Sequence, residues 1–174
     1  TFDDCIQVNE LMEYDINNGK LLNSLDYQEA LAEFYPELDD PELITICGII
    51  PGDNNPTLYL RVIDSDISID RITYNTKSRS FSDCEKGIIT LEAFSDDYFE
   101  NIVRVGDKDI ATVYCNDTGK NSYKFYIIDG SASRVVKLSD TINENISELE
   151  DFIIDGDKLI ALADIYDVGD SHKA

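Results

Sequence analysis

The sequence predicts an α+β fold, mainly an antiparallel β-sheet meander with one or two helices in the N-terminal 40 residues. Three observations favour this class. From residue 43 onward, apolar residues recur with the period of two that is typical of strands. The connections between these runs are short and rich in Gly, Pro, Asn and Asp, which favours antiparallel neighbours. Helical spacing of apolar residues is confined to the first 40 residues.

The N-terminal segment 1–42 is acidic and is predicted to be partly helical. Thr1 and Asp4 form a candidate capping box at the start of a first helix. Asp26, with a glutamate three residues later, is a candidate N-cap of a second helix, which Pro36 would end.

A β-hairpin is the alternative to the first helix. Residues 12–16 alternate like a strand, and the Asn-Gly pair at 18–19 tolerates the positive φ angles of a type I′ turn. Leu21 and Leu25 would then lie on the returning strand. The residues themselves fit both structures.

The second part of the chain, residues 43–170, is predicted to be an antiparallel β region that forms a single domain with the N-terminal segment. The predicted strands are 43–50, 57–64, 67–74, 87–94, 101–105, 109–115, 122–129, 134–138, 151–155 and 158–166. Residues 123–128 are largely apolar on both alternating faces, which predicts a central strand. One face holds Tyr123, Phe125 and Ile127, and the other holds Lys124, Tyr126 and Ile128.

Two short internal repeats are visible. Residues 106–111 (GDKDIA) match residues 156–161 (GDKLIA), and residues 60–64 (LRVID) match residues 125–129 (FYIID). Chance similarity between antiparallel hairpins is one explanation of these matches. A repeated structural unit is the other.

The predicted four-strand meander at 101–138 resembles one blade of a β-propeller, as does the hairpin at 14–22. The resemblance covers at most half of the chain and includes no WD or kelch signature. It implies a surface or scaffold module that belongs to a longer chain, because closed propellers have about four to eight blades.

The charge of the chain is strongly negative, with 36 acidic and 14 basic residues and a net charge of −22. The acids are concentrated in residues 1–42 and 140–157, which flank a nearly balanced middle. Such a protein repels nucleic-acid phosphates and anionic lipids and attracts basic partners. We therefore expect neither nucleic acid nor a membrane as a partner.

Catalytic motifs are missing from the sequence. The only histidine, His172, lies in a polar tail, and no Gly-rich phosphate loop, HExxH or GxSxG motif occurs. Residues 15–26 resemble an EF-hand or dockerin calcium loop, but Gly19 stands at position 5 of that loop, whereas an EF-hand needs glycine at position 6. The chain is therefore predicted to be no enzyme, with no catalytic residue, cofactor or metal site.

The four cysteines, Cys5, Cys47, Cys84 and Cys115, are widely spaced and include no CxxC pair. A structural zinc site is therefore not expected. They are either free thiols or two disulfides. The first interpretation agrees with the cytoplasmic location that we expect.

The predicted function is that of a non-enzymatic acidic binding protein that neutralises or inhibits a basic protein partner, for example a nuclease toxin. Size and charge make this an analogy with the class of toxin-immunity and DNA-mimic proteins. The alternative is a β-propeller-like surface or scaffold module that binds peptide or glycan. The residues expected to bind a basic partner are Asp39, Asp40, Glu42, Glu144, Glu148, Glu150 and Asp151.

Overall fold

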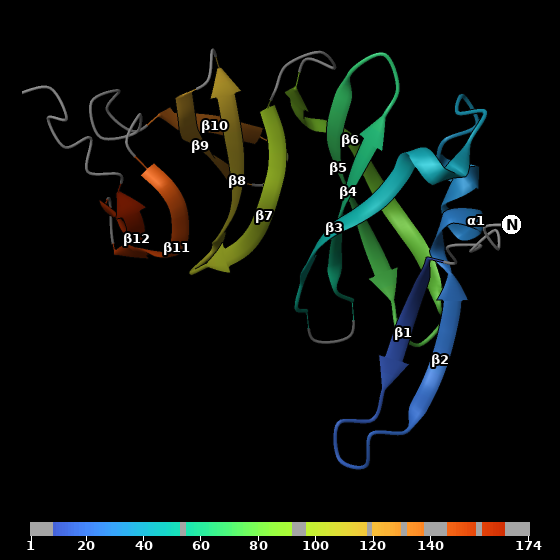
Figure 1. The fold of residues 1–174 in the computed structure, drawn as a ribbon. Helices are drawn as coiled ribbons and strands as arrows, with labels where there is room; N and C mark the ends of the chain where they lie inside the picture. Colours follow the sequence, from blue (N-terminus) through green and yellow to red (C-terminus); the bar gives the residue numbers. More distant parts are fainter. Residues whose placement is uncertain are drawn as a thin grey trace, which may run out of the picture.

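The computed structural model describes residues 9–52, 55–91, 97–117, 120–129, 132–137, 146–155 and 158–165. This part of the chain is mostly antiparallel β-structure with one short α-helix. The strands form two four-stranded sheets and two two-stranded sheets, rather than the one meander that the sequence predicted. Figure 1 shows these sheets side by side along the molecule.

The first layer is a hairpin of β1 (Glu10–Tyr14) and β2 (Leu21–Asp26). The hairpin alternative is therefore correct for these residues, whereas Thr1 and Asp4 of the predicted capping box lie outside the described residues. The predicted type I′ turn is wrong. Gly19 has a φ of 69°, but Asn18 is not in the left-handed region, and the amide of Asp15 bonds to the carbonyl of Lys20 across a longer loop.

The short helix α1 (Tyr27–Leu31) begins where the sequence predicts a second helix. The Asp26 carboxylate accepts hydrogen bonds from the backbone amides of Gln28 and Glu29, each at 3.1 Å, as an N-cap does. A 3-10 turn, η1 (Ala32–Phe34), extends the helix before Pro36, and a second one, η2 (Pro41–Leu43), precedes the first sheet.

Sheet I consists of four consecutive antiparallel strands. These are β3 (Ile44–Ile50), β4 (Thr57–Ile63), β5 (Ile67–Asn75) and β6 (Ser80–Leu91), in the order β3-β4-β5-β6. The first three agree closely with prediction. The fourth begins at Ser80 instead of residue 87, because the positive φ angles of Asp83 (53°) and Gly87 (67°) and two register shifts against β5 break its alternation.

Sheet II repeats this topology. It consists of β7 (Asp97–Val105), β8 (Lys108–Asp117), β9 (Lys120–Asp129) and β10 (Ala132–Lys137), in the order β7-β8-β9-β10. Residues 123–128 lie in β9, between β8 and β10, which confirms the predicted central strand. The last layer is a second two-stranded sheet, β11 (Ile146–Asp155) and β12 (Lys158–Ile165).

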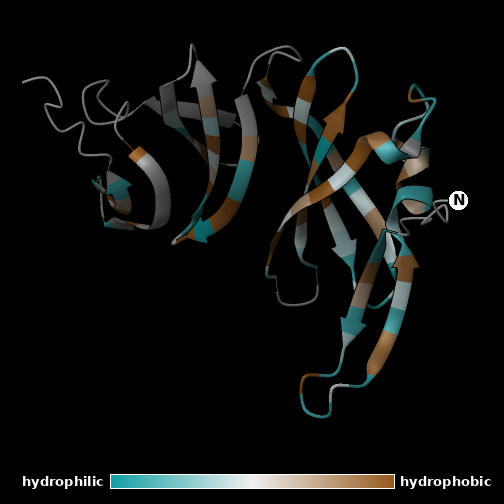
Figure 2. Cartoon of the chain, in the orientation of Figure 1, coloured by the Kyte–Doolittle hydropathy of each residue, from teal (hydrophilic) through white to brown (hydrophobic). Residues whose placement is uncertain are grey.

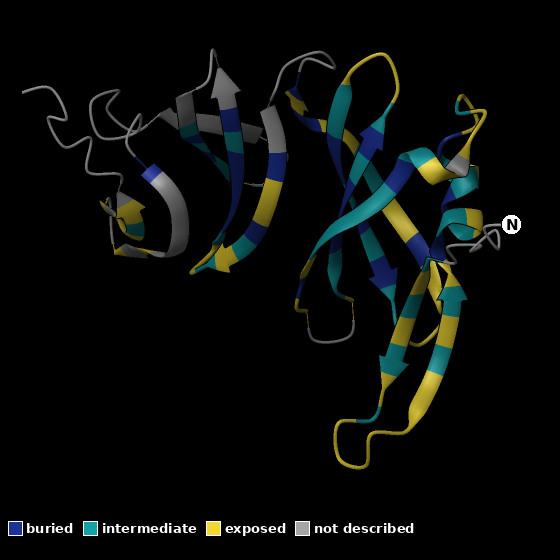
Figure 3. Cartoon of the chain, viewed as in Figure 1, coloured by how far each residue is buried: buried dark blue, intermediate teal, exposed yellow. Residues whose placement is uncertain are grey.

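The layers are held together by three hydrophobic clusters. The first lies between sheet I and the N-terminal layer of hairpin and α1, the second between sheets I and II, and the third between sheet II and the β11–β12 layer. At the second, Gly48 of β3 lies directly against Ile102 of β7. Figure 3 shows buried residues in sheet I and in the described parts of sheet II, while the β1–β2 hairpin is exposed or half-buried.

One of the two sequence repeats corresponds to equivalent elements. Residues 106–111 span the turn between β7 and β8 and the start of β8, and the described part of residues 156–161 forms the start of β12. The other match falls on the second strand of sheet I and the third strand of sheet II, so these two positions are not equivalent.

Candidate functional site

One edge of the stacked sheets collects exposed acidic side chains. The strand register places the start of β3 beside the end of β4, since Ile44 pairs with Val62, and Ile63 pairs with Ile67 at the start of β5. The segment before β3 and the turn between β4 and β5 therefore share one edge of sheet I, at the top of Figure 1. We call this the acidic edge, and it presents Asp39, Asp40, Glu42, Asp64 and Asp66.

All five carboxylates of the acidic edge are exposed, and short hydrogen-bonded turns carry them. The Asp40 carboxylate accepts a hydrogen bond of 2.9 Å from the Glu42 amide, and the Asp64 amide donates to the carbonyl of Asp66 at 3.0 Å. Turns of this kind hold the charges in place before a partner arrives, which lowers the entropy lost on binding.

The basic residue Lys86 near this edge is already engaged. Lys86 donates to Glu37 at 2.6 Å, which lowers the pKa of that carboxyl group, and the Lys86 ammonium lies 4.4 Å from the centre of the Tyr35 ring. Among the described residues, no ion pair engages the five carboxylates of the acidic edge.

The opposite edge differs in charge. The turn between β5 and β6 carries Lys77 and Arg79, and the hairpin turn carries Lys20 beside Asp15. Lys108, next to the turn between β7 and β8, forms an ion pair with Asp129 at 3.1 Å. Acidic and basic groups are therefore mixed in the described turns of this edge, whereas the five residues of the acidic edge are all negative.

The second predicted acidic segment lies elsewhere. Glu148, Glu150 and Asp151 belong to β11, where Glu148 is aligned with Asp164 and the pairing skips Glu150. Glu144 lies outside the described residues. Since β11 belongs to the last layer and Asp39, Asp40 and Glu42 lie beside the first, the structure does not bring the two predicted segments together (Figure 1).

Sequence reasoning did not connect Asp64 and Asp66 with Asp39, Asp40 and Glu42. The sequence nevertheless contains a signal for this grouping. In an antiparallel meander, every second connection between strands lies at the same edge of the sheet. In sheet I, the connection before β3 and the connection between β4 and β5 are separated by one connection, so they lie at the same edge.

A buried carboxylate fixes the acidic edge to sheet I. Asp70 of β5 is 1% exposed and accepts hydrogen bonds from Tyr35 Oη at 2.8 Å, Ser68 Oγ at 2.7 Å and the Gly87 amide at 2.8 Å. Burial raises the pKa of Tyr35, so its hydroxyl stays a donor at neutral pH. Because Tyr35 precedes Asp39 by only a few residues, this bond anchors the turn that carries the acids.

A second buried carboxylate joins the two four-stranded sheets. Asp109 of β8 accepts a 2.7 Å hydrogen bond from Tyr59 Oη of β4 and two bonds from the Arg104 guanidinium, at 2.7 and 3.0 Å. Burial raises the pKa of Tyr59 as well. Both networks use their carboxylates as hydrogen-bond acceptors within the fold, which is a structural role.

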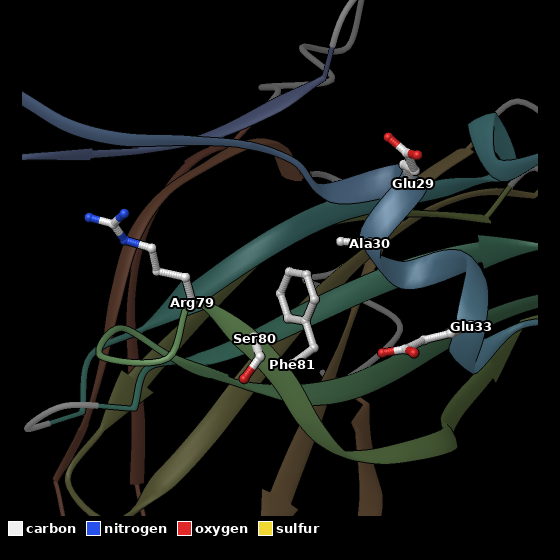
Figure 4. A pocket seen from close by; sticks show the side chains of 6 residues that line it. All are labelled: Glu29, Ala30, Glu33, Arg79, Ser80 and Phe81. Atoms are coloured by element: carbon white, nitrogen blue, oxygen red, sulfur yellow. The ribbon is translucent and has the colours of Figure 1, made fainter.

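A shallow depression lies between α1 and the start of β6, and Figure 4 shows its lining. Its volume is about 280 Å³, and Glu29, Ala30, Glu33, Arg79, Ser80 and Phe81 surround it. The Arg79 guanidinium extends away from both glutamates (Figure 4) and donates to the carbonyl of Leu22 at 3.3 Å. The lining therefore contains no paired acid and base for catalysis.

Thiol chemistry is unfavourable at the described cysteines. Cys47, Cys84 and Cys115 are free thiols, which excludes the disulfide alternative for these three, while Cys5 lies outside the described residues. Burial raises the pKa of Cys47 to about 12 and also raises that of Cys84. Neither is therefore a thiolate nucleophile at neutral pH.

The described residues contain no group of three or more His, Cys, Asp or Glu side chains arranged to hold a metal ion. The segment with the calcium-loop resemblance is the β1–β2 hairpin. Its first acid, Asp15, accepts hydrogen bonds from Asn17 and from the Asn18 amide group, so the carboxylate closes the turn. These bonds lower the pKa of Asp15.

The chain matches no family model, and comparisons with curated proteins and with solved structures give no significant match. None of the helices in the described part of the chain has the length and hydrophobicity that crossing a membrane requires.

Proposed function

We propose that the chain is a non-enzymatic binding module whose blade-like sheets present the acidic edge to a basic protein partner. The observation that carries this proposal is the separation of charge. Five exposed carboxylates, none of them in an ion pair with another described residue, lie at one edge of sheet I, whereas the turns of the opposite edge mix both signs. Such a field attracts a basic surface from a distance and orients it on approach.

The fold supports a binding role through its rigidity. Sheet I is covered on both faces, and Tyr35 ties the acidic turn to the buried Asp70. A surface held this firmly loses little conformational freedom when a partner docks. Neutralisation of a basic toxin is the most specific form of this function and remains a prediction.

The blade-like repetition favours the scaffold alternative as a second candidate. Two successive sheets share the same strand order, the same hairpin connections and a face-to-face interface. Their first strands begin at Ile44 and Asp97, and β11 begins at Ile146, so the repeat is about 50 residues long, as in kelch-type blades. A module of this kind would bind peptide or glycan through the loops at its edges.

The test compares two charge reversals of equal size. Asp64→Lys with Asp66→Lys alters the acidic edge, and Asp107→Lys with Asp155→Lys alters exposed turns of the opposite edge. The probe is a poly-lysine peptide of defined length, and the readout is its association rate at low salt. We expect the edge variant to slow association roughly tenfold and the control variant to have a much smaller effect.

Two further variants examine residues that the sequence predicts to bind a basic partner. Asp39→Lys with Glu42→Lys leaves Asp40 in place, because the Asp40 carboxylate closes its own turn. Glu148→Lys with Glu150→Lys changes the distant β11 segment. Equal association rates for the edge and control variants at low salt would contradict the proposal. Only the net charge of the protein, and not its position, would then affect association.

A further inference from the structure

The two end layers of the molecule are half sheets with complementary positions. β11 and β12 follow sheet II as β7 and β8 follow sheet I, and the sequence match between residues 106–111 and 156–161 falls on equivalent hairpins. They therefore correspond in order to the first two strands of sheets I and II. The hairpin β1–β2 precedes sheet I in the chain, so it takes the place of the last two strands of such a sheet.

Both half sheets have a free edge in the described part of the chain. There, β1 pairs with β2 and β12 pairs with β11. An unpaired strand edge is a template for further pairing. Placing β12 beside β1 gives the order β11-β12-β1-β2, which is the order of sheets I and II.

The outer face of each half sheet carries exposed apolar side chains among polar ones. In the last layer, Ile153 is aligned with Ile160, and Leu162, two residues along the strand from Ile160, is 66% exposed. On the hairpin, Met12 and Tyr14 are about half exposed. Figure 2 shows hydrophobic segments on this hairpin, and Figure 3 shows its residues as exposed or half-buried. By contrast, both faces of each four-stranded sheet are packed against a neighbouring layer.

A hollow lies beside β1. It has a volume of about 430 Å³ and lies between β1 and β3, where Met12, Ile46 and Ile49 line it. Ile49 of β3 is 54% exposed, while its neighbours Gly48 and Ile50 face sheet II. A second β-layer placed beside β1 would cover Ile49 in the way that β7 covers the other face of β3.

We propose that the chain self-associates head to tail, with β12 of one copy pairing antiparallel with β1 of a second copy. The composite sheet buries Ile153, Ile160 and Leu162 of the first copy against Ile49 of the second. In its described part, each copy holds two four-stranded and two two-stranded sheets, so this pairing of two copies gives six four-stranded sheets. Closed blade rings have about four to eight sheets, so a pair is the smallest assembly that closes.

The test is the molar mass of the intact chain by light scattering over a dilution series. We expect a dimer of twice 19.6 kDa that dissociates on dilution. Ile160→Lys with Leu162→Lys, and separately Met12→Lys with Tyr14→Lys, should each give monomers, because a buried lysine is strongly disfavoured at an apolar interface. Ser82→Lys with Thr90→Lys, on exposed positions of β6, is the matched control and should remain a dimer.

Mixing the two monomeric variants makes the test specific for head-to-tail pairing. The Met12/Tyr14 variant keeps an unaltered β12, and the Ile160/Leu162 variant keeps an unaltered β1. Since β12 of the first can pair with β1 of the second, the mixture should form dimers again. Circular dichroism of each variant checks that the fold is retained. A wild-type monomer at every concentration, a dimer that survives both substitutions, or a mixture that stays monomeric would each overturn the proposal.

The result of this self-association test can be distinguished from the result of the peptide-binding test at the acidic edge. Association through apolar faces should persist in high salt, whereas peptide binding at the acidic edge should weaken as salt screens charges beyond about 8 Å at 0.15 M. Reversal of Asp64 and Asp66 should leave the dimer intact.

Discussion

Gly48→Ala tests the packing of sheet I on sheet II at its closest point. A Cβ at residue 48 would lie well within 3.0 Å of Ile102 Cγ2, whereas ordinary contact begins near 3.4 Å. Ile102 is 4% exposed within the shared cluster, so it has little room to retreat. Overpacking of this kind costs about 1–3 kcal/mol. We expect the free energy of unfolding to fall by about that amount.

A double-mutant cycle separates this clash from any other effect of the alanine. Ile102→Ala alone should cost about 2–5 kcal/mol through the cavity it leaves. In the double variant, the methyl group added at residue 48 fills part of that cavity without a clash, so the combined loss should be smaller than the sum by at least about 1 kcal/mol. Urea denaturation followed by circular dichroism measures all four proteins.

Gly106→Ala is the control for this cycle. Gly106 has a φ of 64° and open space around its Cα, so alanine there strains the backbone without touching another residue. Its cost, about 1–2 kcal/mol, should add to that of Ile102→Ala without coupling. Additive losses for Gly48→Ala and Ile102→Ala would refute the close packing of β3 on β7.

Two further predictions concern how stability depends on pH and how the melting temperature responds to calcium. Burial raises the pKa of Cys47 from 9.0 and that of Tyr74 from 10.0, each to about 12, so the folded chain keeps protons that the unfolded chain loses. Stability to urea should therefore fall as the pH rises from 9 towards 12, and less steeply in Tyr74→Phe. Calcium should leave the melting temperature unchanged, because Asp15 already closes its turn; a saturable increase would contradict this assignment.

Local structure was predictable wherever a single pattern decided it. The period of two located most strands, and Asp26 marked the start of α1 because its carboxylate caps two amides. In β9 the alternation also separated the residues of its two faces. Tyr123 and Phe125 pack in the cluster towards the β11–β12 layer, and Ile128 packs in the one towards sheet I.

Prediction failed where side-chain pattern and backbone geometry disagree. The first half of β6 holds mostly polar residues, and its positive φ angles at Asp83 and Gly87 shift the register, so no period remains to detect. The hairpin turn carries the Asn-Gly pair of a tight turn, yet the bonds that Asp15 accepts from Asn17 and Asn18 stabilise a longer loop. Stacking of separate sheets depends on contacts such as Gly48 on Ile102, which have no local signature.

The position of the acids follows from topology rather than from their density in the sequence. Counting charges pointed to the two ends of the chain, and this grouped Asp39 with residues that lie on another layer. Strand order instead groups Asp39 with Asp64 and Asp66, because the connection before β3 and the one after β4 meet at the same edge. A partner that recognises this protein by charge would therefore contact residues far apart in sequence. Peptides copied from residues 1–42 alone should compete poorly for it.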